Sequence, residues 1–332
     1  ASFVSSNHCD NDTTIFLGNS GLISSNNTYK WSFGISGQSA NSILNIGTNH
    51  ITLIVENLNN TCIDSVTQNV EIHPLPIADF NVEDICEGEK AIFLDNSSNN
   101  TVSWFYDFAD GFGSSLNQNA YYEYSSSGTY NTILNIVSDN GCKNSVSKDV
   151  EVYSLPITDF LIDNNCEGEF STFTSISSVL NGNISSLLFD FNDGDFSSDS
   201  ISNYLFLNDG DFDVKLTSIS DNGCESSKLK KVTIFDKPII DFTVTNFCFG
   251  STTSFIDNSI VNNANLIDWN WVLDGEAYSS DQNFSHTFSS PGFFDISLNV
   301  LSDSGCSSFV SKKITIYDVP KVDFEYPNDI CI

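Results

Sequence analysis

The sequence predicts an all-β fold built of tandem antiparallel β-sandwiches, and three observations lead to this fold class. The side chains of several segments alternate with a period of two, as in the run Tyr130, Thr132, Leu134 and Ile136, and this alternation is typical of half-buried strands. Asn, Asp, Gly and Ser separate these runs, and they favour turns. The whole pattern recurs about every 80 residues, which indicates a series of similar modules. No segment shows the apolar period of a sizeable helix.

Each module begins with a strand that carries a Phe, and it contains cysteines at similar positions. The Phe residues, at steps of 77, 80, 82 and 82, are Phe3, Phe80, Phe160, Phe242 and Phe324. A first Cys follows six or seven residues after each Phe, at Cys9, Cys86, Cys166, Cys248 and Cys331. A second Cys follows 53 to 58 residues later, at Cys62, Cys142, Cys224 and Cys306.

Short Pro-containing segments separate the modules. An alternating run after the second Cys leads to Pro156, Pro238 or Pro320, and the next Phe-bearing strand follows almost at once. Because Pro favours an extended backbone, the links are expected to be short and stiff, with neighbouring modules abutting. The predicted domains are residues 1–76, 77–156, 157–238 and 239–320, with residues 321–332 as the first strand of a following repeat.

An aromatic strand that ends in Asp-Gly lies in the middle of three modules. These strands run over residues 104–111, 189–194 and 269–275. They resemble the Trp-Asp-Phe-Gly-Asp-Gly signature of PKD (polycystic kidney disease-like) domains, and residues 128–130 and 291–294 match the second hallmark of that family. The resemblance implies immunoglobulin-like sandwiches with the aromatic strand in the core. The first module lacks Asp-Gly after Trp31 and is interpreted as a diverged copy.

The charge of the chain excludes several classes of partner. Twelve Lys, no Arg and 43 acidic residues give a net charge of −31. A nucleic-acid binder or a protein that docks on anionic lipid needs a positive surface, so neither partner is expected. No apolar run is long enough for membrane insertion. The absence of Met and the abrupt end at Ile332 suggest an excerpt of a longer polypeptide.

The combination of PKD modules, paired cysteines and an acidic, Asn- and Ser-rich composition resembles the very large surface adhesins of gliding bacteria, which are exported by the type IX route. This resemblance implies a non-catalytic segment of an extracellular stalk or filament at the cell surface. The implied partners are further repeats of the same chain and a surface polysaccharide or other adhesive ligand. PKD modules also serve as spacers in secreted enzymes, so a spacer array of a polysaccharide-degrading or proteolytic enzyme is the alternative.

No enzymatic activity is predicted for this segment. The sequence has no His-Glu-x-x-His, no Gly-x-Ser-x-Gly and no phosphate-binding loop. Its four His residues fall at unrelated phases of the repeat, so none recurs beside a nucleophile or a metal ligand.

The phased cysteines are interpreted as disulfides, since no Cys-x-x-Cys or Cys/His cluster suggests zinc. Pairing within a repeat would join Cys9–Cys62, Cys86–Cys142, Cys166–Cys224 and Cys248–Cys306, and Cys331 would then pair within a domain beyond the excerpt. Pairing between neighbouring repeats would join Cys9–Cys142, Cys86–Cys224 and Cys166–Cys306, leaving Cys62, Cys248 and Cys331 for domains elsewhere.

The two cysteines of one sandwich are expected at opposite poles, roughly 20 Å apart, whereas a disulfide needs Cα atoms about 5 to 7 Å apart. This favours pairing between neighbours, although a bulged or switched first strand would permit the other.

Acidic residues gather in the third module and suggest a calcium site. Carboxylates before and after one strand are expected to face each other, and flexible acidic loops suit calcium. The candidates are Asp190, Asp193 and Asp195 with Asp209, Asp211 and Asp213. The alternative is that they are solvated turn residues. No other cofactor is expected.

Three short motifs resemble the Asp-Ser/Thr-apolar sites that gliding bacteria use for O-glycosylation. The hydroxyl residues of these motifs are Thr13, Ser65 and Ser200. They are candidate sites of O-linked modification, which fits an extracellular address.

Overall fold

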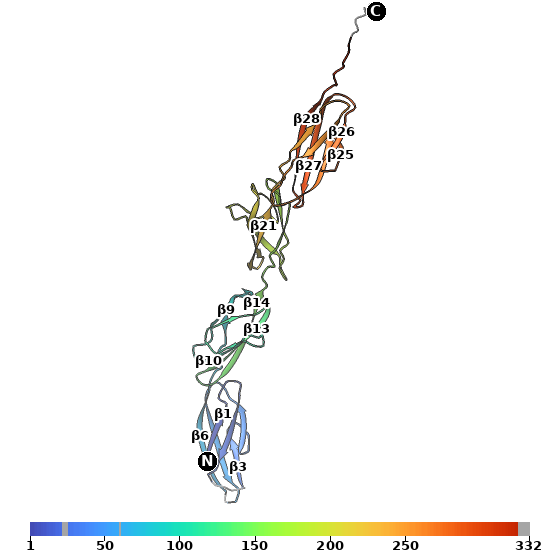
Figure 1. The fold of residues 1–332 in the computed structure, drawn as a ribbon. Coiled ribbons are helices and arrows are strands. Elements are labelled where there is room, and N and C mark those ends of the chain that lie inside the picture. The colour runs from blue at the N-terminus through green and yellow to red at the C-terminus, as the bar shows by residue number, and fades with distance from the viewer. Residues whose placement is uncertain (22–25, 60, 325–332) are drawn as a thin grey trace, which may run out of the picture. The chain divides into compact units, whose positions relative to one another are not determined.

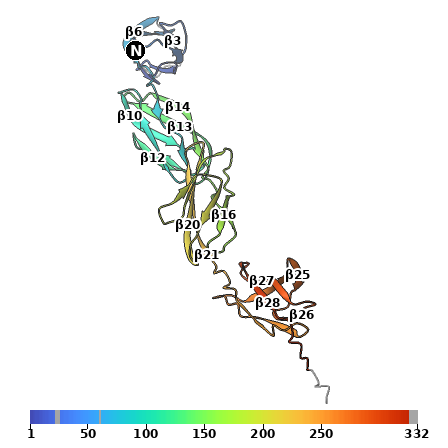
Figure 2. The ribbon, with the colours of Figure 1, turned by 90° about the horizontal axis from the view of Figure 1, so that it is seen from above.

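The computed structural model describes residues 1–21, 26–59 and 61–324, and these form an all-β chain (Figure 1 and Figure 2). The described residues contain 28 strands in eight sheets and no helix. The chain divides into two compact units, Ala1–Ser154 and Leu155–Ile332, and each is described by itself. The all-β fold class predicted from the sequence is confirmed.

The first unit begins with a sandwich of two three-stranded sheets. One sheet has the order β1 (Ser2–Ser6), β2 (Thr13–Asn19) and β4 (Ser39–Ile43). The other has the order β3 (Asn27–Trp31), β5 (Gly47–Asn57) and β6 (Cys62–Ile72). Phe3, Phe16, Trp31 and Leu53 pack between them. The alternation of buried and exposed residues along β2 is the period of two seen in the sequence.

The second sandwich of this unit has a three-stranded and a five-stranded sheet. The first has the order β12 (Ala120–Glu123), β9 (Lys90–Asp95) and β7 (Phe80–Asn81). The second has the order β11 (Ser114–Ser115), β10 (Thr101–Asp107), β13 (Gly128–Ser138), β14 (Lys143–Tyr153) and β8 (Ile85–Cys86). Strand β8 pairs in parallel with β14, so the chain crosses from one sheet to the other between β7 and β8.

The second unit begins with a sandwich of the same plan. Its smaller sheet has the order β15 (Phe160–Asp163), β16 (Phe170–Ser175) and β19 (Ile201–Leu205). Its larger sheet has the order β18 (Phe196–Ser197), β17 (Ile184–Asp190), β20 (Gly210–Ser220) and β21 (Glu225–Ile234). Five of the nine buried residues in its core are Phe, among them Phe160, Phe173 and Phe189.

The last sandwich differs from the others at one edge. Its smaller sheet has the order β22 (Phe242–Thr245), β23 (Thr252–Asp257) and β26 (Phe284–Thr287). Its larger sheet has the order β25 (Glu276–Ser279), β24 (Leu266–Leu273), β27 (Gly292–Ser302) and β28 (Ser307–Ile316). Asp274 and Gly275 have φ of 49° and 86°, the signs that a tight hairpin turn needs, and so β25 turns back directly on β24.

The aromatic strand lies in the core, as the sequence predicted. Where its central residue carries a polar atom, that atom donates to a loop carbonyl: the Trp31 and Trp271 Nε1 groups to Gly37 and Asp281 at 2.9 Å, and the Tyr106 hydroxyl to Gln118 at 3.1 Å. Such a partner is usual for a buried Trp or Tyr. The four cores each draw on one predicted repeat, while the exact domain boundaries stay a prediction.

Candidate functional sites: disulfides and polar clusters

Each unit contains a disulfide between cysteines of neighbouring repeats. Cys9 bonds to Cys142 in the first unit and Cys166 to Cys306 in the second, both with Cα atoms 5.6 Å apart. Pairing within a repeat is therefore wrong for these four cysteines. The reason is that the first and second Cys lie at opposite ends of one sandwich, so a first Cys meets the second Cys of the next repeat.

The local contacts show how the two cysteines of a bond meet. Cys9 and Cys166 form parallel bridges with His73 and Phe235, which follow the last strand of their own repeats. The carbonyl oxygens of the same two residues lie 4.0 Å from the Cys142 Sγ and 3.8 Å from the Cys306 Sγ. The disulfide thus forms beside the short link that joins one repeat to the next.

The Ser-Asp-x-Gly-Cys turn holds the second Cys in position. The Ser138 Oγ accepts the Cys142 amide hydrogen at 3.1 Å, and the Ser302 Oγ accepts that of Cys306 at 3.2 Å. Both Ser residues are buried, and Gly141 takes the positive φ of 80° that the turn needs. This motif presents the sulfur to the preceding repeat.

The remaining cysteines have separate outcomes. The predicted Cys86–Cys224 bond would join the two units and stays a prediction. Cys248 has an exposed, free thiol, and Cys62 is exposed on β6. Cys331 lies outside the described residues.

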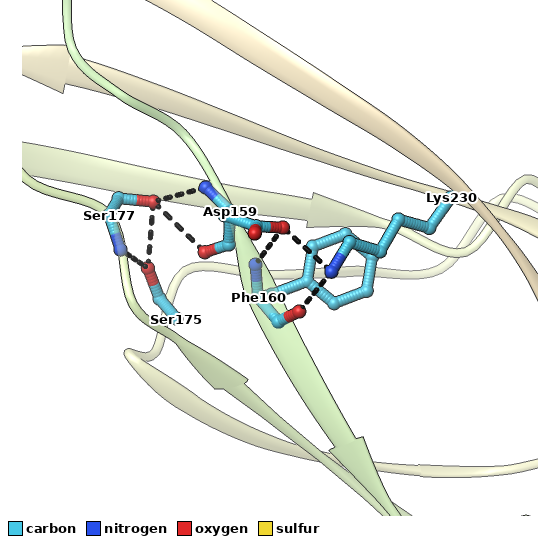
Figure 3. A network of polar contacts seen from close by, with 5 residues as sticks. All are labelled: Asp159, Phe160, Ser175, Ser177 and Lys230. Carbon is cyan, nitrogen blue, oxygen red and sulfur yellow. Dashed lines mark hydrogen bonds and ion pairs between the residues drawn. The ribbon is translucent and has the colours of Figure 1, made fainter.

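A cluster of Asp, Phe and Lys recurs in the second, third and fourth repeats, and Figure 3 shows it in the third. The Lys230 Nζ lies 4.8 Å from the centre of the Phe160 ring and donates to the Phe160 carbonyl oxygen at 2.5 Å. It also forms an ion pair with Asp159 at 2.6 Å. Asp159 is held by Ser177, whose Oγ accepts its amide hydrogen at 3.3 Å. The corresponding sets are Asp79, Phe80, Lys148 and Asp241, Phe242, Lys312.

The cluster links the two sheets of one sandwich. Phe160 lies on β15 in the smaller sheet, and Lys230 lies on β21 in the larger sheet. The hydrogen bond from Lys230 lowers the pKa of Asp159, and Lys148 and Lys312 do the same for Asp79 and Asp241. The first and last strands of a repeat are thereby fastened together by a cation, a carboxylate and an aromatic face.

Sequence reasoning missed this cluster, although a signal was present. Asp precedes Phe at the start of these repeats, and a Lys stands six residues after each of their second cysteines. In the first repeat the same positions hold Ser2 and Gln68.

A second polar contact joins the Asp-Gly turn to a strand of the smaller sheet, β12 or β19, in two repeats. The Tyr122 hydroxyl donates to Asp110, and the Tyr204 hydroxyl donates to Asp193. The hydrogen bond to Asp110 raises the pKa of Tyr122 to about 12, and burial together with Asp193 raises that of Tyr204 to about 12. These contacts anchor the turn, and the second uses Asp193, a carboxylate that the sequence had suggested for calcium.

The six Asp residues of the third repeat do not form the predicted two-sided cluster. Asp190 accepts the Asn192 amide hydrogen, and Asp193 accepts from Tyr204. Asp211 contacts Lys231 at 3.4 Å and Thr233 at 2.7 Å, and Asp213 pairs across the strands with Lys231. Asp195 and Asp209 are the other two candidates, and hydrogen bonding to Asp236 raises the pKa of Asp209. Over residues 1–21, 26–59 and 61–324, no group of three His, Cys, Asp or Glu side chains could hold a metal ion.

The candidate glycosylation residues are accessible. Thr13 begins β2, Ser65 lies on β6, and Ser200 directly precedes β19, and all three are exposed. O-linked modification at these residues stays a prediction.

These features define a chain of disulfide-linked, immunoglobulin-like β-sandwiches, which are non-catalytic domains. The PKD domain family model matches residues 73–152 and 236–316, so the chain contains tandem PKD domains. The disulfides and the PKD domains indicate an extracellular or secreted protein. Among the described residues, no helix is long and apolar enough to span a membrane.

The chain is also similar to individual proteins over part of its length. The pre-pro-metalloprotease PrtV of Vibrio cholerae is 23% identical over 141 residues, which are 42% of this chain and 15% of the metalloprotease. The chain thus spans a small part of that relative. The solved PKD1 domain of Vibrio anguillarum Epp is 21% identical, with 26% of this chain and 99% of that domain covered and a TM-score of 0.24. The solved PKD1 domain of PrtV is 26% identical, with 24% of this chain and 96% of that domain covered and a TM-score of 0.23.

Proposed function

We propose that this chain is a structural segment of the stalk or filament of a very large secreted cell-surface adhesin. The adhesin would serve attachment or gliding motility and would be exported by the type IX route. The observation that carries the proposal is the pairing of Cys9 with Cys142 and of Cys166 with Cys306. Bonds of this kind fasten one repeat to the next and add nothing to a catalytic or ligand-binding surface, so they suit a part that sets distance and transmits force.

The link between the third and fourth repeats supports this proposal because it forms polar contacts with both of them. In the second unit the Phe235 amide donates to Asn165 at 2.7 Å, and Lys237 forms an ion pair with Glu169 at 2.6 Å. Further along the same link, Ile239 and Ile260 exchange two backbone hydrogen bonds of 2.8 and 3.0 Å. A link held in this way bends less than a free chain, which a long tether requires.

The surface charge supports an extended assembly of many such repeats. A net charge of −31 keeps similar β domains in solution and opposes edge-to-edge pairing between copies. The partners of this segment would be further repeats of the same chain. A surface polysaccharide or another adhesive ligand would be bound by the parent protein, and neither nucleic acid nor membrane insertion is part of the proposal.

Small-angle scattering on the 332-residue chain tests the proposal. Four sandwiches stacked end to end, each about 35 to 40 Å long, should give a rod of about 150 Å whose length does not change with salt. Incubation with polysaccharide and peptide substrates should give no hydrolysis. A compact particle, or hydrolysis of either substrate, would contradict the stalk.

The alternative is a spacer array in a secreted enzyme, and the similarity to a metalloprotease favours it. The complete reading frame separates the two proposals. Many more repeats without a catalytic domain support the adhesin, whereas one protease or glycosidase domain beside a few repeats supports the spacer.

A further inference from the structure

We propose that the disulfides form a short covalent path through this chain, so that a pulling force is transmitted without lengthening the chain when repeats unfold. The proposal depends on the stalk function only in assuming that force acts along the chain. The path itself is a property of the covalent connections.

The path follows from the two disulfides of the structure. A force applied at the N-terminus reaches Cys9 and crosses directly to Cys142. It then follows the backbone to Cys166 and crosses to Cys306. Residues 10–141 and 167–305 lie in closed loops and are bypassed. Between Cys9 and Cys306, only the backbone from Cys142 to Cys166 carries the force.

This connecting segment has little length in reserve. Cys142 and Cys166 are 24 positions apart, so the segment can reach at most about 85 Å when fully extended. Most of it is already extended in the folded chain, because it contains β14 (Lys143–Tyr153) and β15 (Phe160–Asp163). A strand rises about 3.3 Å per residue, close to the limit for any backbone. Unfolding the surrounding repeats would therefore release little additional length from either strand.

The spacing of the cysteines along the sequence supports a length-matched path. From a second Cys to the next first Cys the distance is 24 positions at Cys62–Cys86, Cys142–Cys166 and Cys224–Cys248, and 25 at Cys306–Cys331. From a first to a second Cys it varies from 53 to 58. The bypassed part of each repeat thus tolerates insertions, while the connecting part keeps its length.

Both strands of the connecting segment are also fastened to their sandwiches. Lys148 on β14 forms an ion pair with Asp79 at 2.8 Å and lies over the Phe80 ring. Phe160 on β15 accepts the Lys230 Nζ at its carbonyl oxygen. The Asp–Phe–Lys clusters therefore hold the two strands that carry the force against the rest of their repeats.

The experiment is single-molecule stretching of the 332-residue chain, held at its two termini by tags that do not react with thiols. With disulfides intact, the chain should stop lengthening at about 200 Å, since only residues 1–9, 142–166 and 306–332 lie on the path. With disulfides reduced, it should reach about 1,150 Å, a nearly six-fold increase.

Two variants and a control locate the path. The double variant Cys9→Ser with Cys142→Ser should lengthen the oxidised chain by roughly 400 to 490 Å, as should Cys166→Ser with Cys306→Ser. Cys248→Ser, which lies off the path, should leave the limit unchanged. These limits are set by covalent connections, so they can be measured even if a variant folds poorly.

An oxidised wild-type chain that lengthens in repeat-sized steps of about 280 Å would overturn the proposal. That result would leave an extensible stalk as the proposed function. Conversely, a parent protein with a catalytic domain would contradict the adhesin while leaving the measured limit, and therefore the covalent path, in place.

Discussion

The first repeat and the three that follow it have cores of the same kind and differ in the contacts that join the outer strands of each repeat. Trp31 and Trp271 occupy the same central position, and each donates to a loop carbonyl at 2.9 Å. The later repeats add the Asp–Phe–Lys cluster, whereas the first has Ser2 and Gln68 at those positions. Alternation and a central aromatic residue therefore suffice for the sandwich, and the cluster is an addition that fastens its outer strands.

The largest expected effect comes from the shared core. Trp31→Ala and Trp271→Ala should each destabilise their own repeat by about 3 to 5 kcal/mol, because each leaves a cavity among buried aromatic side chains. Hydrogen exchange of the amides on β5 and β27 measures the two repeats separately. Phe309→Ala, at a side chain that is 76% exposed, is the control and should change neither. A loss confined to the fourth repeat would show that the first has a different core.

The Asp–Phe–Lys cluster should have a smaller effect. Lys148→Met removes the ion pair and the cation over Phe80 while keeping most of the side-chain bulk, and it should cost about 1 kcal/mol. Chemical denaturation followed by exchange in β14 measures this loss. Gln68→Met in the first repeat is the matched control and should be nearly neutral. Equal losses in both variants would show that the cluster contributes nothing.

Lowering the pH should reduce the difference in the free energy of unfolding between wild type and Lys148→Met. The hydrogen bond from Lys148 lowers the pKa of Asp79, so its contribution is complete above the ordinary carboxyl pKa and is lost as the pH falls through the lowered value. Repeating the denaturation series from neutral to acidic pH checks this. A difference that stays constant with pH would assign the effect to packing alone.

High pH should reduce the stability of the second and third repeats by ionising a tyrosine that the first and fourth repeats lack at this position. The pKa values of Tyr122 and Tyr204 are raised to about 12, so these tyrosines stabilise the fold below the ordinary pKa and lose that contribution as the pH rises toward about 12. Ultraviolet titration of the phenolates measures the shift, and Tyr122→Phe should remove one late-titrating group. His286 takes this position in the fourth repeat, so that repeat should show no such change. Titration of both tyrosines at ordinary values would contradict the Asp contacts.

Calcium should have the smallest effect. Because Asp193 and Asp211 are engaged by Tyr204, Lys231 and Thr233, calorimetric titration at millimolar calcium should show no saturable heat. Asp193→Asn and Asp211→Asn should behave like the wild type. Saturable heat that either variant abolishes would restore the site suggested by the sequence.

The sequence was sufficient for the repeat, the strands and the aromatic core, because each depends on local alternation and recurs four times. The expected distance between the poles of a sandwich also favoured the disulfides that the structure contains. The Asp–Phe–Lys cluster was missed because Phe160 and Lys230 are 70 positions apart and lie on different sheets, so no local pattern connects them. The six Asp residues suggested for calcium do not gather for a related reason: Asp211 and Asp213 are close in sequence to Asp209, but pairing of β20 with β21 places them beside Thr233 and Lys231.

Non-reducing peptide mapping of the purified chain reports which repeats are covalently joined. We expect peptides that contain Cys9 linked to Cys142 and Cys166 linked to Cys306, with Cys248 recovered as a free thiol. Reduction before digestion should abolish both linked species. Dominant Cys9–Cys62 and Cys166–Cys224 peptides would contradict the account, because each repeat would then be closed on itself and no covalent path would cross between repeats.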